Sequence, residues 1–212
     1  MIAADDVSGA SAKLIPQVSR RRADTVPRVS MLVLINGVPG SGKSTLARRY
    51  VEDHPLALDL DIDQVRAMLG RWLEAPAEAG RAARDLALAM AGVHLAGGKD
   101  VVLPQYLGRL DFVLELEMLA QQAKARFVEI ALRSGRDEVI SRLARRSTDP
   151  QNSEQHDAAM LLERSGGLDA LPAMDERMKS VIAARPATRA VVTVDGEIDE
   201  TYLRMLAQIN AI

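Results

Sequence analysis

The chain has 212 residues, of which 48% are hydrophobic and 26% charged, and its net charge is −2 at neutral pH. This length fits one domain with a full core, and the charge offers no general positive field for nucleic acid. The absence of cysteine excludes disulfides, thiolate metal sites and cysteine catalysis. No apolar run approaches the roughly 18–20 residues of a membrane span, and because the first residues contain no long apolar stretch we do not expect them to be a secretory signal. We therefore expect a cytoplasmic protein without a membrane partner.

Residues 1–29 differ from the rest of the chain in composition. They are rich in Ala, Ser, Asp and Arg, and they show neither helical nor strand periodicity. The segment Arg20–Arg22 is a small basic cluster, which is more typical of a solvated charge run than of a nucleic-acid site. We expect residues 1–29 to form a mobile N-terminal extension and residues 30–212 to form the folded domain.

Residues 31–45 combine a predicted strand, a glycine-rich loop and the beginning of a helix. Met31–Ile35 is an unbroken apolar run, which is typical of a strand buried on both faces. Gly37, Gly42, Lys43 and Ser44 then fit the pattern G-x-x-x-x-G-K-[ST], which in this context indicates a phosphate-binding loop. Backbone N–H groups and Lys43 would hold the phosphates of ATP or GTP, and the Ser44 hydroxyl would bind Mg²⁺. The expected nucleotide contacts are Gly37, Val38, Pro39, Gly40, Ser41, Gly42, Lys43, Ser44 and Thr45.

The remaining segments alternate between strand and helix patterns. Further strands are expected at 56–60, 100–104, 126–132 and 190–194. Helices are expected at 45–51, 64–69, 76–97, 110–124, 136–146, 198–209 and 158–184, the last broken at Gly166-Gly167 and Pro172. Such alternation predicts an α/β fold in which a parallel sheet is covered on both faces. Ligands of such sheets bind beyond the carboxyl ends of the strands, so residues that directly follow strands are site candidates.

Two carboxylates follow the second predicted strand. Asp61 and Asp63 are two residues apart in an extended stretch, so their side chains share one face, and Arg66 lies three residues beyond Asp63. One interpretation is that Asp63 only caps the helix that follows. Beside a nucleotide, however, a carboxylate can orient an acceptor hydroxyl and accept its proton. We expect Asp63 to have this catalytic role, which is compatible with capping.

The phosphate-binding loop and the stretch Asp61-Ile-Asp63-Gln-Val-Arg66 together resemble P-loop kinases that phosphorylate small molecules and nucleic-acid ends. This group contains zeta toxins, chloramphenicol phosphotransferases and polynucleotide 5′-hydroxyl kinases. The resemblance implies a P-loop NTPase with three α/β/α layers, a five-stranded parallel sheet in kinase order and a small arginine-bearing lid. It also implies that Asp63 is the general base, that Arg66 contacts the substrate and that Asp61 lies near the metal.

One departure from the family pattern concerns the metal. The third predicted strand ends at Gln105, where related proteins place an acidic residue that helps to hold Mg²⁺. Metal binding would then depend on Ser44, Asp61 and water.

Several arginines lie near the end of the helix that is expected at 136–146. Arg142 and Arg146 are four residues apart and project together, and Arg145 lies beside Arg142. The polar residues 147–157 that follow would form the lid loop. Arginines closing from a lid can neutralise the charge of a phosphoryl group during transfer, so Arg142 and Arg146 are candidate catalytic residues. The alternative is that they only complement the dipole at a helix end.

The acceptor pocket is expected between the helices that follow the second and third strands. Tyr106, Arg109 and Arg66 are its candidate substrate contacts, and Trp72 has either a packing role or a stacking role. These features favour an ATP- and Mg²⁺-dependent kinase, monomeric or homodimeric, that acts on a hydroxyl of a small molecule such as a metabolite, an antibiotic or a nucleotide-like compound. A polynucleotide kinase, a zeta-like nucleotide-sugar kinase and an NTP-binding switch without an acceptor remain alternatives.

Overall fold

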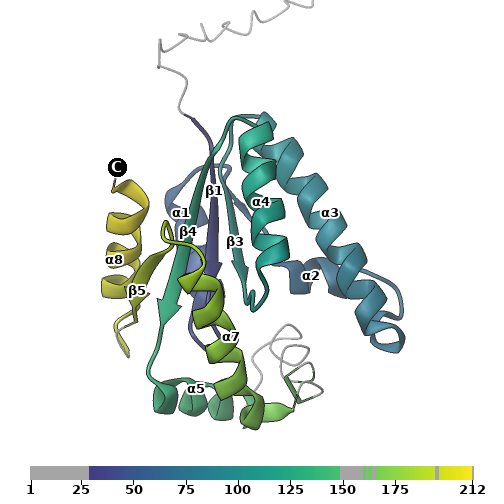
Figure 1. The fold of residues 1–212 in the computed structure, drawn as a ribbon, viewed down its shortest axis with the longest axis vertical. Helices are drawn as coiled ribbons and strands as arrows, with labels where there is room; N and C mark the ends of the chain where they lie inside the picture. The colour runs from purple at the N-terminus through teal and green to yellow at the C-terminus, as the bar shows by residue number, and fades with distance from the viewer. Residues whose placement is uncertain (1–28, 149–159, 161, 164–165, 194–195, 212) are drawn as a thin grey trace, which may run out of the picture.

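The fold is built on one parallel β-sheet of five strands in the order β2-β3-β1-β4-β5 (Figure 1). The computed structural model describes residues 29–148, 160, 162–163, 166–193 and 196–211. The strands are β1 (Met31–Asn36), β2 (Leu58–Asp59), β3 (Val101–Gln105), β4 (Arg126–Arg133) and β5 (Arg189–Val192). The prediction of an α/β fold with five parallel strands is therefore confirmed.

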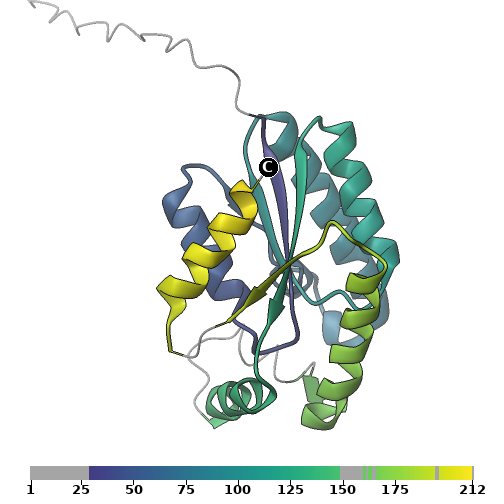
Figure 2. The ribbon, with the colours of Figure 1, turned by 60° about the vertical axis from the view of Figure 1, so that its left-hand side comes forward.

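Helices cover both faces of this sheet. They are α1 (Lys43–Asp53), α2 (Ile62–Ala67), α3 (Pro76–Ala96), α4 (Leu110–Gln122), α5 (Arg136–Thr148), α7 (Leu171–Ala183) and α8 (Ile198–Asn210), and the short 3₁₀ turns are Trp72–Glu74 and Gly167–Ala170. Helices α1 and α8 lie on one face, and α3 and α4 lie on the other (Figure 2). Within the part of the chain that the structure describes, no helix has the length and apolar character needed to cross a lipid bilayer.

The central strand β1 supplies both halves of the core. Leu32 and Leu34 pack among residues of α3 and α4, whereas Val33 and Ile35 pack among residues of α1 and α8. This alternation follows from the two-residue period of a strand, and it explains why all six residues of β1 are buried. An unbroken apolar run is what such a strand requires.

The edge strand β2 is shorter than the strand expected at 56–60. Leu56 has a left-handed backbone (φ 65°) and is 70% exposed, so it cannot continue the sheet. The pairing with β3 extends slightly beyond the two strand residues, because the N–H of Leu60 donates to the carbonyl of Val102 at 2.9 Å. The sequence pattern marks the apolar residues here correctly but not the turn that precedes them.

The break expected within residues 158–184 is present in part. Gly166 has φ 106°, a left-handed conformation that ends regular helix, and a 3₁₀ turn separates it from α7. Pro172, however, lies in the first turn of α7, where its missing N–H has no intrahelical partner to lose. Pro172 therefore lies in the first turn of this helix and does not interrupt it. Residues 1–28 and 149–157, with the expected extension and most of the lid loop, lie outside the described residues.

A buried ion pair fixes the far end of α7. Arg185 lies just after this helix. Its guanidinium donates to Glu129 of β4 at 2.5 Å and to Glu117 of α4 at 3.0 Å. The Glu129 side chain is only 2% exposed, so removing Arg185 would leave a buried charge without compensation. The chain between α7 and β5 is thereby held against the sheet.

The buried phenol of Tyr202, on α8, generates a prediction about alkaline stability. Burial, and then the neighbouring Asp53 carboxyl, raise the pKa of Tyr202 from 10.0 to about 12. Between pH 10 and 12 the folded chain therefore holds a proton that the unfolded chain has lost, so stability is complete below pH 10 and falls as the pH rises. We expect Tyr202→Phe to remove on the order of 1 kcal/mol of this fall. Urea denaturation at pH 8, 10 and 11 would measure it; equal pH slopes for the variant and the wild type would contradict the assignment.

Candidate active site

The loop between β1 and α1 has the backbone of a phosphate-binding loop. Gly40 and Gly42 have φ of 81° and 95°, conformations that residues with a Cβ rarely adopt. Gly37 is required for another reason, since a Cβ there would lie 2.5 Å from the Ser41 Oγ. The three glycines thus allow a tight turn at the carboxyl end of β1.

The N-terminus of α1 and Lys43 both face this loop. Gly42 precedes α1 and has no side chain to cap it, so the N–H groups of the first helical turn remain directed at the loop. The Lys43 Nζ donates to the carbonyl oxygen of Val38 at 3.0 Å, which places the ammonium group over the loop. Helix N–H groups and an ammonium group at one point form a site for an anion.

Helix α5 packs directly on the phosphate-binding loop. Val38 of the loop shares an apolar cluster with Val139 of α5 and Met174 of α7. Gly40 lies so close to α5 that a Cβ would be 3.0 Å from the Leu143 Cγ. The loop and the helix that bears the predicted arginines are therefore neighbours.

Of the arginines predicted for the lid, Arg142 lies beside the loop. Its Nη1 atom is 3.9 Å from the position that a Cβ on Gly42 would occupy. Its guanidinium also pairs with Glu138 one turn earlier, and both side chains are largely buried. Arg145 and Arg146 belong to α5, but their side chains are outside the described part of the structure. Arg142 thus lies near the loop, and the catalytic role of Arg142 and Arg146 stays a prediction.

The residues after β2 form a cap and an ion pair. The Asp61 Oδ1 accepts from the N–H of Asp63 at 2.9 Å and caps α2, which begins two residues earlier than expected. The interpretation of Asp63 as the capping residue is therefore wrong, because Asp61 has that role. The Asp63 Oδ1 instead accepts from the Arg66 Nη2 at 2.6 Å. The Asp63 side chain remains 44% exposed, whereas that of Arg66 is 15% exposed.

The sequence analysis missed Asn36, at the end of β1. Its side chain is fully buried, donates to the carbonyl of Leu107 at 3.1 Å and accepts from the N–H of Leu107 at 2.9 Å. This two-bond contact fixes the loop after β3 against the beginning of the phosphate-binding loop. A polar residue that directly follows an apolar strand run was the available signal.

Tyr106 connects the loop after β3 to α7. Its hydroxyl donates to the carbonyl of Met174 at 3.0 Å and accepts from the Nε of Arg177 at 3.4 Å. A Cβ on Gly108 would lie 2.4 Å from this hydroxyl, so that position also requires glycine. Arg109 is exposed and immediately precedes α4. Arg177 belongs to no motif, which explains why the sequence analysis missed it.

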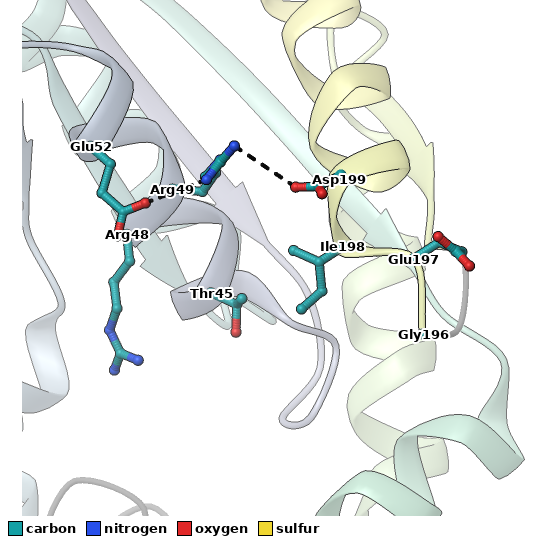
Figure 3. A pocket seen from close by; sticks show the side chains of 8 residues that line it. All are labelled: Thr45, Arg48, Arg49, Glu52, Gly196, Glu197, Ile198 and Asp199. Carbon is teal, nitrogen blue, oxygen red and sulfur yellow. Dashed lines mark ion pairs between the residues drawn. The ribbon is translucent and has the colours of Figure 1, made fainter.

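An open cavity of about 470 Å³ lies beside the phosphate-binding loop, between α1 and the beginning of α8 (Figure 3). Thr45, the last residue of the predicted loop motif, lines it. Across the cavity, Arg49 of α1 faces Asp199 of α8 at 3.9 Å. The other lining residues are Arg48, Glu52, Gly196, Glu197 and Ile198, which the sequence analysis did not mark.

Metal ligands are sparse in this region. Among the residues that the structure describes, no three or more His, Asp or Glu side chains come close enough together to hold a metal ion. Ser44 and Asp61 stay predicted ligands of Mg²⁺.

Gly40 and Gly98 together distinguish the effect of backbone strain from the effect of close packing on α5. Gly40→Ala imposes left-handed strain and also brings a Cβ against Leu143, whereas Gly98→Ala imposes the same kind of strain (φ 73°) in open space. We expect Gly98→Ala to cost about 1 kcal/mol and to leave ATP binding intact. Gly40→Ala should cost about 1–2 kcal/mol more and weaken ATP binding at least tenfold. Denaturation and calorimetric titration measure both effects; equal losses in the two variants would show that close packing on α5 is unimportant.

Comparisons with known proteins agree with this architecture. The family model AAA_33, an AAA domain, matches residues 32–166. A candidate kinase from Chloroflexus aurantiacus superposes with a TM-score of 0.60 at 19% identity, covering 87% of this chain and 100% of its own. A Sinorhizobium meliloti gluconokinase shares the fold with a TM-score of 0.55 at 17% identity, covering 86% of this chain and 93% of its own. The Deinococcus radiodurans tunicamycin resistance protein shares it with a TM-score of 0.54 at 14% identity, covering 86% of this chain and 97% of its own.

No curated protein matches the sequence significantly. The family match nevertheless covers more than half of the chain and includes the phosphate-binding loop, α2 and α5. The expected P-loop fold is thus confirmed: the chain belongs to the AAA domain family and shares its fold with the kinases named above.

Proposed function

We propose that this protein is an ATP- and Mg²⁺-dependent kinase that transfers the γ-phosphoryl group to a hydroxyl of a small molecule. The observation that carries the proposal is the pairing of an anion site with a carboxylate at one edge of the sheet. Lys43 and Arg142 lie at the loop after β1, and Asp63 follows β2, the edge strand. Because all strands are parallel, both groups occupy the carboxyl edge, where ligands of such sheets bind.

The cationic groups have separate tasks in this proposal. Lys43 and the N–H groups of α1 hold the β- and γ-phosphates of the nucleotide. Arg142 stabilises the negative charge that spreads over the phosphoryl oxygens during transfer. Ser44 and Asp61 hold Mg²⁺, which when bound neutralises phosphate charge.

Asp63 is the group that distinguishes a kinase from a simple hydrolase. Its carboxylate accepts a hydrogen bond from the acceptor hydroxyl, orients the oxygen and takes its proton as transfer proceeds. Arg66 pairs with this carboxylate, and its buried Nε has no acceptor among the described residues. An oxygen of the bound acceptor would satisfy that donor, which supports the substrate role of Arg66. Tyr106 and Arg109 complete the acceptor side.

The cavity between α1 and α8 is the proposed position of the nucleoside. It is lined by Thr45, the last residue of the loop motif, so a nucleotide whose phosphates occupy the loop could extend its nucleoside into it. Its lining includes both Arg49 and Glu52, and this mixture of charges does not choose between adenine and guanine. We assign ATP because of the resemblance of the chain to P-loop kinases.

An NTP-binding switch is the competing function from another class, and the absence of an acid at Gln105 is the observation in its favour. A screen decides between the two. Hydroxyl compounds, including sugars, nucleosides, aminoglycosides and a 5′-hydroxyl oligonucleotide, are incubated with labelled ATP and the enzyme. Transfer of label to one compound, absent with Lys43→Ala, supports the kinase. Acceptor-independent ATP turnover alone supports the switch.

Asp63→Asn should separate catalysis from stability. The substitution retains the shape of the side chain but removes the basic carboxylate, so we expect a rate loss of roughly a hundredfold or more. Stability should change by less than about 1 kcal/mol, because the lost ion pair with Arg66 is half exposed on the Asp63 side. Label transfer and thermal melting measure the two effects. Glu200→Gln breaks a comparable ion pair on α8 and should change neither; a fully active Asp63→Asn enzyme would exclude Asp63 as the base.

The arginines of α5 should affect the rate more than ATP binding. We expect Arg142→Ala to lower kcat about tenfold to a hundredfold with little change in the KM for ATP, because the guanidinium acts mainly on charge in the transition state. Arg146→Ala should behave similarly, and Arg145→Ala should not. Arg204→Ala is a matched control, since Arg204 pairs with an acid one turn earlier, as Arg142 does. If Arg142→Ala and Arg204→Ala give the same steady-state constants, Arg142 has no catalytic role.

A further inference from the structure

Asp63, Arg66 and Trp72 form a continuous chain of contacts. The guanidinium of Arg66 lies between the two other side chains: its Nη2 is 2.6 Å from the Asp63 Oδ1, and its central carbon is 5.2 Å from the centroid of the Trp72 ring. This distance is within the range of a cation–π contact. Trp72 is the only tryptophan in the sequence. The ring therefore touches a residue that touches the proposed catalytic base.

The backbone before Trp72 is strained in a way that brings the ring to this position. After α2, the N–H of Leu69 bonds back to the carbonyl of Arg66 at 3.0 Å, and Gly70 follows with open space around it. Arg71 then adopts φ 54° and ψ 29°, a left-handed conformation that is unfavourable for a residue with a Cβ. The chain thereby enters the 3₁₀ turn at Trp72, and Arg71 pairs with Glu74 across it at 2.7 Å. Strain at a non-glycine residue persists only where the surrounding structure enforces it.

Packing in the core does not explain the position of the ring. Trp72 is partly exposed, and it belongs to none of the three hydrophobic clusters found among the described residues. Its neighbour Leu69, by contrast, packs against the cluster on the α3 and α4 face. The ring contact that the structure shows for Trp72 is with the guanidinium of Arg66.

The ion pair alone would hold Asp63 only weakly. Its carboxylate is 44% exposed, and pairs of this exposure gain little because water and side-chain rotation compete with them. The Trp72 ring adds a second contact to the guanidinium, and two contacts restrict the position of a side chain more than one does. Catalysis by a carboxylate requires close control of its orientation toward the reacting oxygen.

We propose that Trp72 is a positioning residue, which holds Arg66 and through it fixes the Asp63 carboxylate toward the acceptor hydroxyl. This inference rests on the proposed role of Asp63 in phosphoryl transfer. The contact chain itself is independent of that role, so one test addresses the chain and another addresses its use in catalysis.

The contact chain is tested by the fluorescence of the full-length protein, in which Trp72 is the sole indole. Asp63→Asn does not alter any atom that touches the ring, yet it should loosen Arg66 and raise the acrylamide quenching constant of Trp72 about twofold. Arg66→Gln should raise it at least as much. Glu78→Gln is the control, because it makes the equivalent acid-to-amide change at an exposed position early in α3. Quenching that is unchanged in both Asp63→Asn and Arg66→Gln would overturn the proposal.

The catalytic use is tested with Trp72→Phe and Trp72→Leu, using ATP and the hydroxyl compound that the screen identifies. Phe retains an aromatic face and should preserve most of kcat; Leu should lower kcat about tenfold with an unchanged KM for ATP. Equal kcat values for the two folded variants would overturn the proposal. If Trp72→Leu fails to fold, Trp72→Gln takes its place as the non-aromatic variant, and a kcat equal to that of Trp72→Phe would again overturn it. If the wild type transfers no label to any compound, the proposed function fails, whereas the fluorescence result still supports or overturns the contact chain.

Discussion

The parallel direction of all five strands is the constraint on which the rest of the molecule depends. A parallel sheet with helical connections must be buried on both faces, and β1 at its centre has no exposed side chain. Every strand then ends at the same edge. The phosphate-binding loop, the cap at Asp61 and the loop at Tyr106 are far apart in the sequence and meet only for this reason. Asn36 strengthens the convergence, because its buried amide joins the ends of β1 and β3.

Charge at this edge is organised in pairs. Arg142 contacts Glu138, and Arg66 contacts Asp63, so two of the proposed site cations have a carboxylate partner within the same helix. The Arg142 pair is largely buried and keeps that guanidinium in place before a ligand is present, whereas Arg66 also has the Trp72 ring as a contact. The Lys43 ammonium group is held differently, because it donates to a backbone carbonyl of the phosphate-binding loop. The arrangement limits the reorganisation that nucleotide binding requires, which is a condition for strong electrostatic catalysis.

The sequence was sufficient to predict those features that have a local pattern. The phosphate-binding loop, the order of strands and helices and the position of α3 follow from apolar period and glycine spacing, and the structure agrees with them. The alternative interpretation of Asp63 as the α2 cap is wrong, because Asp61 and Asp63 are equally good capping residues and only the backbone at the helix start distinguishes them. Arg177 acts through a tertiary contact with a residue about 70 positions away, for which a single sequence carries no signal. Asn36 did have a signal, because it is a polar residue that directly follows an apolar strand run.

The packing of Gly40 against Leu143 has a consequence for how the enzyme would cycle. The middle of α5 is anchored to the phosphate-binding loop by apolar contacts that involve no nucleotide, and Arg142 belongs to this anchored part. An arginine on a swinging segment must surrender conformational freedom in every turnover. Arg142 has already lost that freedom when the chain folds, so the entropic cost is met once in the lifetime of the molecule and not once per reaction.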